Sequence, residues 1–118
     1  MTKYLTLATV LTLAAPVQAQ TMTGEQVYKM RCQACHTVKA GAPGMVGPNL
    51  ASVVGRKAAT GKFTYSAALI ASKLKWTPAT LDTFLTSPGK MVPGTRMVIS
   101  VSDPAQRAAL ITWLAKAK

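Results

Sequence analysis

Apolar residues recur at helical spacing in several short stretches of this chain, and glycine and proline separate these stretches from one another. Thr23 and Gln26 have the T-x-x-Q spacing of a capping box, which predicts that a helix starts there. We expect one side of this first helix to carry Gly24, Val27, Tyr28, Arg31 and Cys35.

Two further helices are predicted in the middle of the chain. One covers residues 65–74, YSAALIASKL. The other starts at Thr77, because a threonine N-cap before Pro78 suits the first helical turn. Leu81, Phe84 and Leu85 follow at i, i+3 and i+4 and predict one buried face.

A last helix is predicted to start at Asp103, which precedes Pro104 in the same way. Its expected buried stripe consists of Leu110, Trp113, Leu114 and Ala117.

Long loops fill the remaining sequence. Residues 39–58 and 87–95 are rich in glycine and proline, which mark turns. Only residues 97–101, MVISV, resemble a strand, and no partner strand is evident. The pattern therefore predicts an all-α fold of four to five short helices, whose long loops are unusual in a small domain unless they wrap a bound group.

The N-terminal residues 1–19 are predicted to be a secretory signal peptide. Lys3 precedes a short apolar run, and small residues at Val17 and Ala19 favour cleavage after Ala19. An uncleaved membrane anchor is the alternative. Cleavage leaves residues 20–118, enough for one small domain of the kind that a bound cofactor stabilises.

The charge is strongly positive, with a formal net charge of +11 from 14 basic and 3 acidic residues. Such a charge indicates an anionic partner. Nucleic acid is not expected as this partner, because the protein is predicted to be exported and its basic residues form no run interleaved with aromatic residues. The expected partner is therefore the acidic face of another protein.

The chemistry is concentrated in one motif. Cys32, Cys35 and His36 form C-x-x-C-H and include both cysteines and the single histidine of the chain. A redox dithiol, a zinc half-site and a covalent haem attachment all use such residues. Zinc requires four ligands, and a thioredoxin-type dithiol follows a strand, whereas this motif follows a predicted helix. Covalent haem c is therefore favoured, because C-x-x-C-H is the attachment motif of c-type haem.

A second iron ligand has to come from a residue other than histidine, or the site is open. The candidate methionines are Met22, Met30, Met45, Met91 and Met97. Met97 is favoured, because Pro93 and Gly94 turn the chain just before it, so that its segment can cross the far face of the haem. Met91, in the same loop, is its rival.

Residues 23–118 resemble a class I cytochrome c of the soluble bacterial and mitochondrial type. The ordered motifs that carry the resemblance are Gly24, Tyr28, C-x-x-C-H, GPNL at residues 47–50, GRKAATGKFTYS from residue 55, Trp76, PGTRM ending at Met97, and Trp113-Leu114. Phe84, Leu69 and Ile99 depart from the usual family residues.

The resemblance implies a role for each site residue. Cys32 and Cys35 would hold one haem c covalently, His36 and Met97 would be the axial ligands of its iron, and the Pro48 carbonyl would accept a proton from His36. Gly24 would let the first and last helices cross closely against Trp113. The residues implied to pair with the haem propionates are Arg56, Tyr65, Trp76 and Thr95.

The implied function is that of a soluble, monomeric periplasmic cytochrome that carries one electron and is not an enzyme. Lys29, Lys39 and Lys90 are predicted to border the exposed haem edge, with Arg31 and Arg96 beside them, and to dock acidic-faced redox proteins. A membrane oxidoreductase complex and a periplasmic dehydrogenase are both suitable partners. A haem c enzyme or gas-binding sensor remains the alternative if the sixth iron position is open.

Overall fold

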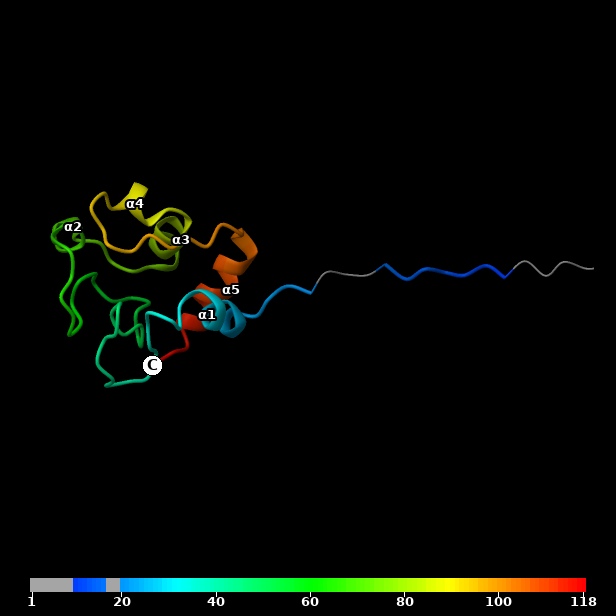
Figure 1. The fold of residues 1–118 in the computed structure, drawn as a ribbon, viewed down its shortest axis with the longest axis horizontal. Helices are drawn as coiled ribbons and strands as arrows, with labels where there is room; N and C mark the ends of the chain where they lie inside the picture. Colours follow the sequence, from blue (N-terminus) through cyan, green and yellow to red (C-terminus); the bar gives the residue numbers. More distant parts are fainter. Residues whose placement is uncertain (1–9, 17–19) are drawn as a thin grey trace, which may run out of the picture.

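The computed structural model describes residues 10–16 and 20–118, and within these ranges the fold is all-α (Figure 1). The five helices are α1 (Gly24–Arg31), α2 (Ala67–Ser72), α3 (Pro78–Thr86), α4 (Pro88–Met91) and α5 (Pro104–Leu114). The described chain has no strand beyond one isolated antiparallel bridge between Lys57 and Lys75. The predicted fold class is therefore confirmed.

Side-chain caps fix the three helix starts that were predicted from the sequence. In α1, the Thr23 hydroxyl accepts from the Gln26 amide at 3.2 Å, and the Gln26 side chain accepts from the Thr23 amide at 2.8 Å. Thr77 caps α3, and Asp103 caps α5 by accepting from the Ala105 amide at 2.8 Å. Each cap satisfies backbone N–H groups that have no partner within the helix.

Two predicted helix and loop boundaries need correction. Helix α2 is shorter than residues 65–74, because Ser66 is its N-cap and Lys73 ends it in the left-handed conformation, with φ at 52°. The predicted loop 87–95 contains α4, which starts at Pro88, directly after Ser87, the C-cap of α3. Residues 97–101 form no strand, in agreement with the expectation that this strand-like stretch lacks a partner.

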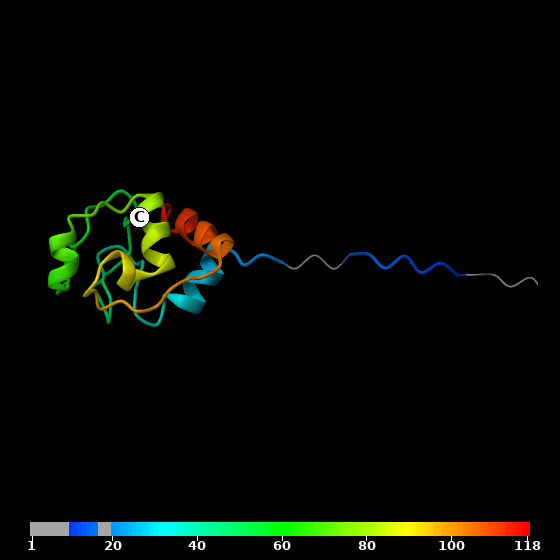
Figure 2. The ribbon, with the colours of Figure 1, turned by 90° about the horizontal axis from the view of Figure 1, so that it is seen from above.

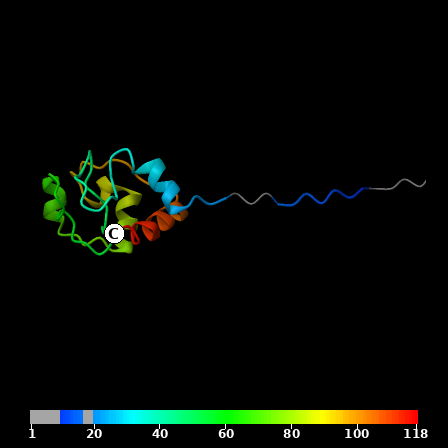
Figure 3. The same ribbon diagram turned by 90° about the horizontal axis from the view of Figure 1, so that it is seen from below.

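The first and last helices cross closely at one end of the molecule, and α2 lies at the opposite end (Figures 2 and 3). Gly24 makes the crossing possible, because a Cβ atom there would lie 2.2 Å from the Ala109 carbonyl oxygen and 2.4 Å from Trp113 Cβ. The rings of Tyr28 and Trp113 pack beside this contact, with centroids 4.9 Å apart.

Gly24→Ala is expected to destabilise the haem-loaded protein by about 3 kcal/mol, because the new methyl group overlaps backbone that cannot move aside. Chemical denaturation would measure the change. Gly89→Ala is the matched control, since a Cβ atom there meets nothing within 4 Å and its effect should stay within about 0.5 kcal/mol. Equal stability of both variants would contradict the close crossing.

The buried face of α5 differs from the predicted stripe. Leu110 and Leu114 are buried, whereas Trp113 and Ala117 are only half-buried. Ile111 and Arg107 are also buried. The Arg107 guanidinium donates to the Asp82 carboxylate at 2.8 Å and to the carbonyls of Val101 and Ser102 at 2.9 Å each. This buried arginine therefore ties α5 to α3 and to the segment that follows Met97.

One residue that was predicted to lie on the first helix lies outside it. Gly24, Val27 and Tyr28 are buried and Arg31 is exposed on α1, whereas Cys35 lies beyond the helix end.

The predicted leader lies largely outside the described residues, which begin at residue 10 and omit residues 17–19 with the expected cleavage point. Residues 10–16 belong to no helix or strand and are exposed, including Val10, Leu11 and Leu13. Among the residues described, no helix combines the length and the apolar character needed to cross a membrane.

Candidate functional site

The cysteine–histidine motif lies in a tight turn directly after α1. The helix ends at Arg31 and Cys32 is its C-cap, so the two cysteines stand in the turn and not on the helix itself. The amides of Cys35 and His36 both donate to the Cys32 carbonyl, at 3.0 and 2.9 Å. Cys32 is buried, Cys35 is half-buried, and both thiols are free. The turn therefore presents two thiols and an imidazole within five residues.

The Cys32 thiol lacks the low pKa of an exchange-active thiol. Burial, and to a lesser extent the neighbouring charge of Cys35, raises the pKa of the Cys32 thiol to about 11. Redox-active thiols have lowered pKa values, because the thiolate is the nucleophile. Cys32 is instead kept protonated, which disfavours the dithiol interpretation of the motif.

His36 is held in place from two sides. Its Nδ1 atom lies 2.7 Å from the Pro48 carbonyl oxygen, which accepts the ring proton and leaves Nε2 to act as a ligand. The tautomer follows from this contact, since a carbonyl only accepts. Gly47 packs flat against the ring, because a Cβ atom there would lie 2.3 Å from His36 Cε1. The Tyr28 hydroxyl donates to the His36 backbone carbonyl at 2.8 Å.

The protonation state of His36 suits a metal ligand. Burial lowers its pKa below the ordinary value, and the hydrogen bond to the Pro48 carbonyl opposes this shift without reversing it. The imidazole is therefore neutral at neutral pH, and neutral imidazole is the form that binds iron.

Asn49 braces the loop that carries Pro48, a role that the sequence analysis did not assign. Its amide nitrogen donates to the carbonyls of Lys39 and Ala42 at 2.8 and 2.9 Å, and its oxygen accepts from the Ala51 amide at 2.8 Å. The sequence signal that could have indicated this role is the position of Asn49 in the GPNL motif. The glycine- and proline-rich loop is thus fixed by side-chain bonds instead of regular secondary structure.

Arg56 is half-buried and carries an unsatisfied donor. Its terminal nitrogens donate to the carbonyls of Ala51 and Asn49, both at 3.1 Å. Its buried Nε atom has no hydrogen-bond partner in the described structure. Buried donors are nearly always paired, so this nitrogen indicates where an anionic group of a bound cofactor fits.

Tyr65 and Trp76 lie in the segments on either side of α2. The half-buried Tyr65 hydroxyl accepts from the Gly61 amide at 2.9 Å, and its own proton is available to a further acceptor. Trp76 is buried and packs on Phe84, with ring centroids 4.9 Å apart. The backbone of Trp76 pairs with Gly55 and Arg56. The structure therefore brings the predicted partners Arg56 and Trp76 side by side.

The candidate sulfur ligands differ in their surroundings. Met97 and Met91 are both half-buried and pack against the core, as does Met22, whose sulfur lies 3.5 Å from Gln106 Nε2 at the start of α5. Met30 and Met45 are exposed by 53% and 54%. Thr95, next to the Met97 segment, is half-buried and its amide donates to the Val92 carbonyl at 3.0 Å.

The predicted docking lysines are all exposed, but they are not equivalent. Lys39 and Lys90 are exposed, whereas Lys29 forms an ion pair with Glu25 at 2.8 Å, four residues away on α1. Arg96 is also engaged, because its guanidinium donates to backbone carbonyls of the segment before α2. Among the described residues of the predicted basic edge, Lys39, Lys90 and Arg31 are exposed and make no ion pair.

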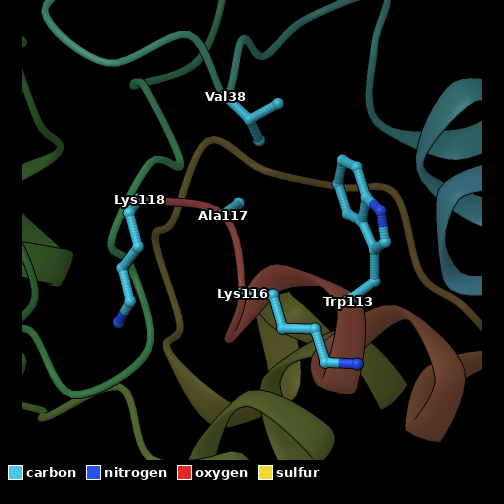
Figure 4. Close-up of a pocket in the computed structure, with 5 residues that line it drawn as sticks. All are labelled: Val38, Trp113, Lys116, Ala117 and Lys118. Atoms are coloured by element: carbon cyan, nitrogen blue, oxygen red, sulfur yellow. The ribbon is translucent and has the colours of Figure 1, made fainter.

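These residues fit a covalently bound haem. Such a haem is held by groups of four kinds, and each kind is present here. They are two free thiols, a neutral histidine whose Nδ1 is fixed by a hydrogen bond, a half-buried methionine and a buried guanidinium nitrogen without a partner. An open pocket of about 270 Å³ between Trp113, Val38 and the C-terminal lysines contains none of these residues and plays no part in the site (Figure 4).

Comparisons with known proteins agree on one family. The sequence model of a family described as cytochrome c matches residues 21–118. A cytochrome c2 from Rhodomicrobium vannielii is 46% identical over 94 residues, which cover 78% of this chain and 74% of the relative. A cytochrome c from Nigella damascena is 39% identical over 94 residues, covering 78% and 85%. The solved structure of cytochrome cH from Methylobacterium extorquens matches with 40% identity and a TM-score of 0.71, covering 77% of this chain and 92% of that one.

Proposed function

The chain belongs to the cytochrome c family, and we propose that it is a periplasmic carrier of single electrons whose haem iron is ligated by His36 and Met97. Members of this family bind one covalent haem c and carry electrons. The observation that carries the proposal is the His36–Pro48 hydrogen bond. It occupies Nδ1 and leaves Nε2 as the free ligand nitrogen, on a histidine that follows two free cysteines in the same turn.

Each site residue has a task in this proposal. When bound, haem supplies an iron that accepts and releases one electron. Cys32 and Cys35 would anchor the macrocycle through thioethers, and His36 would offer Nε2 from a ring that Pro48 and Gly47 hold in one orientation. Met97 supplies a thioether ligand, which raises the reduction potential relative to a second histidine. With His36 and Met97 both holding the iron, the site would be suited to electron transfer and not to turnover of a substrate.

The surroundings favour rapid electron exchange. Arg56, Tyr65, Trp76 and Thr95 are proposed to hydrogen-bond or offset the haem propionates, since a buried carboxylate is costly unless it is paired. The unpaired Arg56 Nε atom supports this assignment. The Arg56 and Tyr65 side chains are already held by hydrogen bonds to backbone groups, so they should move little when the charge of the site changes.

The periplasmic location rests on the N-terminal sequence. The apolar residues Val10, Leu11 and Leu13 are exposed and pack on no part of the core, as expected for a leader that is removed at export. We propose that the mature protein, residues 20–118, is a monomer that meets an acidic-faced membrane complex or a dehydrogenase.

A visible spectrum with and without carbon monoxide tests the proposal directly. Material secreted by a host with haem-attachment machinery is expected to show a low-spin c-type spectrum that carbon monoxide does not change in the reduced form. A spectrum that shifts on addition of the gas would instead identify an enzyme or a gas-binding sensor with an open iron position.

Partner docking is tested by reversing the two free lysines. Lys39→Glu with Lys90→Glu is expected to slow electron transfer to an acidic redox protein about tenfold at low salt, because basic charge steers the encounter. The effect should shrink as the Debye length falls from ~30 Å at 0.01 M to ~3 Å at 1 M salt. Stopped-flow rates measured against ionic strength give the answer.

Lys116→Glu with Lys118→Glu is the matched control, because it changes the net charge equally at the C-terminus. Lys29→Glu is left out, since it would place two carboxylates one helical turn apart. Equal slowing by both double variants would mean that only the net charge matters and that Lys39 and Lys90 mark no docking face.

A further inference from the structure

Arg96 connects two segments that lie far apart in the sequence. Its Nη1 atom donates to the Thr64 carbonyl at 2.9 Å, and its Nη2 atom donates to the Tyr65 carbonyl at 3.4 Å. The two acceptors are consecutive backbone carbonyls, and the planar guanidinium carries two donors in a fixed fork that reaches both. The side chain just before Met97 is therefore fastened to the segment that carries Tyr65.

The turn that precedes Arg96 also brings these two segments together. Gly94 has a φ of 92°, and a Cβ atom there would lie 3.1 Å from the Ala68 side chain on α2. The Thr95 amide closes the turn by donating to the Val92 carbonyl. Figures 1 and 2 both show the chain after α4 running beside α2. A bulkier residue at position 94 would separate these elements, so the approach is built into the sequence.

The Met97 segment has few other fixed points nearby. Val98 is 82% exposed and Ile99 is 48% exposed, and the next buried residue is Val101, whose amide donates to the Leu85 carbonyl at 2.8 Å. Between the turn at Gly94 and Val101, the side chain of Arg96 thus makes the cross-segment hydrogen bonds. A methionine side chain has three rotatable bonds and does not hold itself in one place.

We propose that Arg96 is a positioning residue, which keeps Met97 at the haem iron by fastening its backbone to Thr64 and Tyr65. The inference rests on the proposed ligation by His36 and Met97. Arg96 touches neither the iron nor a redox partner in this role. It restricts the backbone that carries the sulfur, so that the thioether stays in place when a competing ligand is present.

Imidazole is a direct probe of this role, because it binds the ferric iron only by displacing the methionine sulfur. Arg96→Ala is expected to raise the affinity for imidazole about tenfold. A tenfold change corresponds to losing about one charge-assisted hydrogen bond that holds the Met97 segment in place. Arg96→Lys should raise it about threefold, since an ammonium group does not reproduce the fork of two donors. Lys116→Ala, which removes one exposed charge elsewhere, should leave the affinity unchanged.

The sulfur-to-ferric-iron charge-transfer band of the unmodified protein separates the two proposals. If this band is absent, ligation by Met97 is wrong and the role of Arg96 fails with it. If the band is present and all three variants bind imidazole like the unmodified protein, the positioning role alone is overturned. If Arg96→Ala does not fold, Arg96→Lys decides, and an unchanged affinity in that variant rejects the proposal.

Discussion

Replacing Met97 with alanine is expected to open the sixth iron position completely. The reduced protein should then bind carbon monoxide, which the unmodified protein should not, and the sulfur-to-ferric-iron charge-transfer band should disappear. The reduction potential should fall by a sizeable part of the ~0.8 V range that axial ligands span, because thioether sulfur favours the ferrous state. Visible spectra with the gas and a redox titration would measure all three changes.

Met91→Ala is the control that the structure makes necessary. Both methionines are half-buried and pack against the core, so burial alone does not distinguish a ligand from a packing residue. Met91 ends α4, where Pro88 and the α3 contacts fix the backbone, whereas Met97 lies in an extended segment after the Gly94 turn. Met91→Ala should lower stability and leave the band and the gas response unchanged. The reverse pattern would assign the sulfur ligand to Met91.

Replacing both Cys32 and Cys35 with serine is expected to convert a covalent haem into an extractable one. In the unmodified mature protein, acid–organic extraction should leave essentially all of the colour on the chain, and its mass should exceed that of residues 20–118 by one haem. The double variant should lose essentially all of its haem to the solvent, because serine forms no thioether with a vinyl group. Mass spectrometry and extraction provide the measurement.

The single variants refine this result. Cys32→Ser and Cys35→Ser each leave one thiol, so each should retain haem through one thioether, and extraction should fail in both. Cys32 is buried in the core beside Tyr28, and its replacement should therefore destabilise the fold more than replacement of the half-buried Cys35. Haem that can be extracted freely from the unmodified protein would refute covalent attachment.

The sequence predicted those features whose cause is local. Helix starts were found correctly at Thr23, Thr77 and Asp103, because a cap and its partner amide lie two or three residues apart and leave a readable pattern. The C-x-x-C-H motif is equally local, since one turn holds all its reactive groups. The all-α class followed from these patterns, and the family from the order of the motifs.

Local patterns failed where two signals compete. Pro88 and Gly89 indicated a loop, yet the same proline also starts a helix, and packing of α4 against α3 selects the helix. The strand-like composition of residues 97–101 did not mislead the prediction, because a strand requires a partner and none was evident. In the described chain, Val101 is the one residue of this stretch whose amide pairs with another segment, at Leu85.

The sequence by itself determined the helix starts, the attachment motif, the family and the excess of positive charge. Only the tertiary structure left Arg56 Nε without a partner and gave Arg96, which the sequence shows only as a charge, its hydrogen bonds to Thr64 and Tyr65. It also placed the Pro48 carbonyl at His36, a contact that the family resemblance implied but that no local pattern predicts. The physical reason is that a cap or a cysteine turn is closed by neighbours in the chain. A contact across 12 or 32 residues depends on how all the intervening segments pack, and no short pattern records that arrangement.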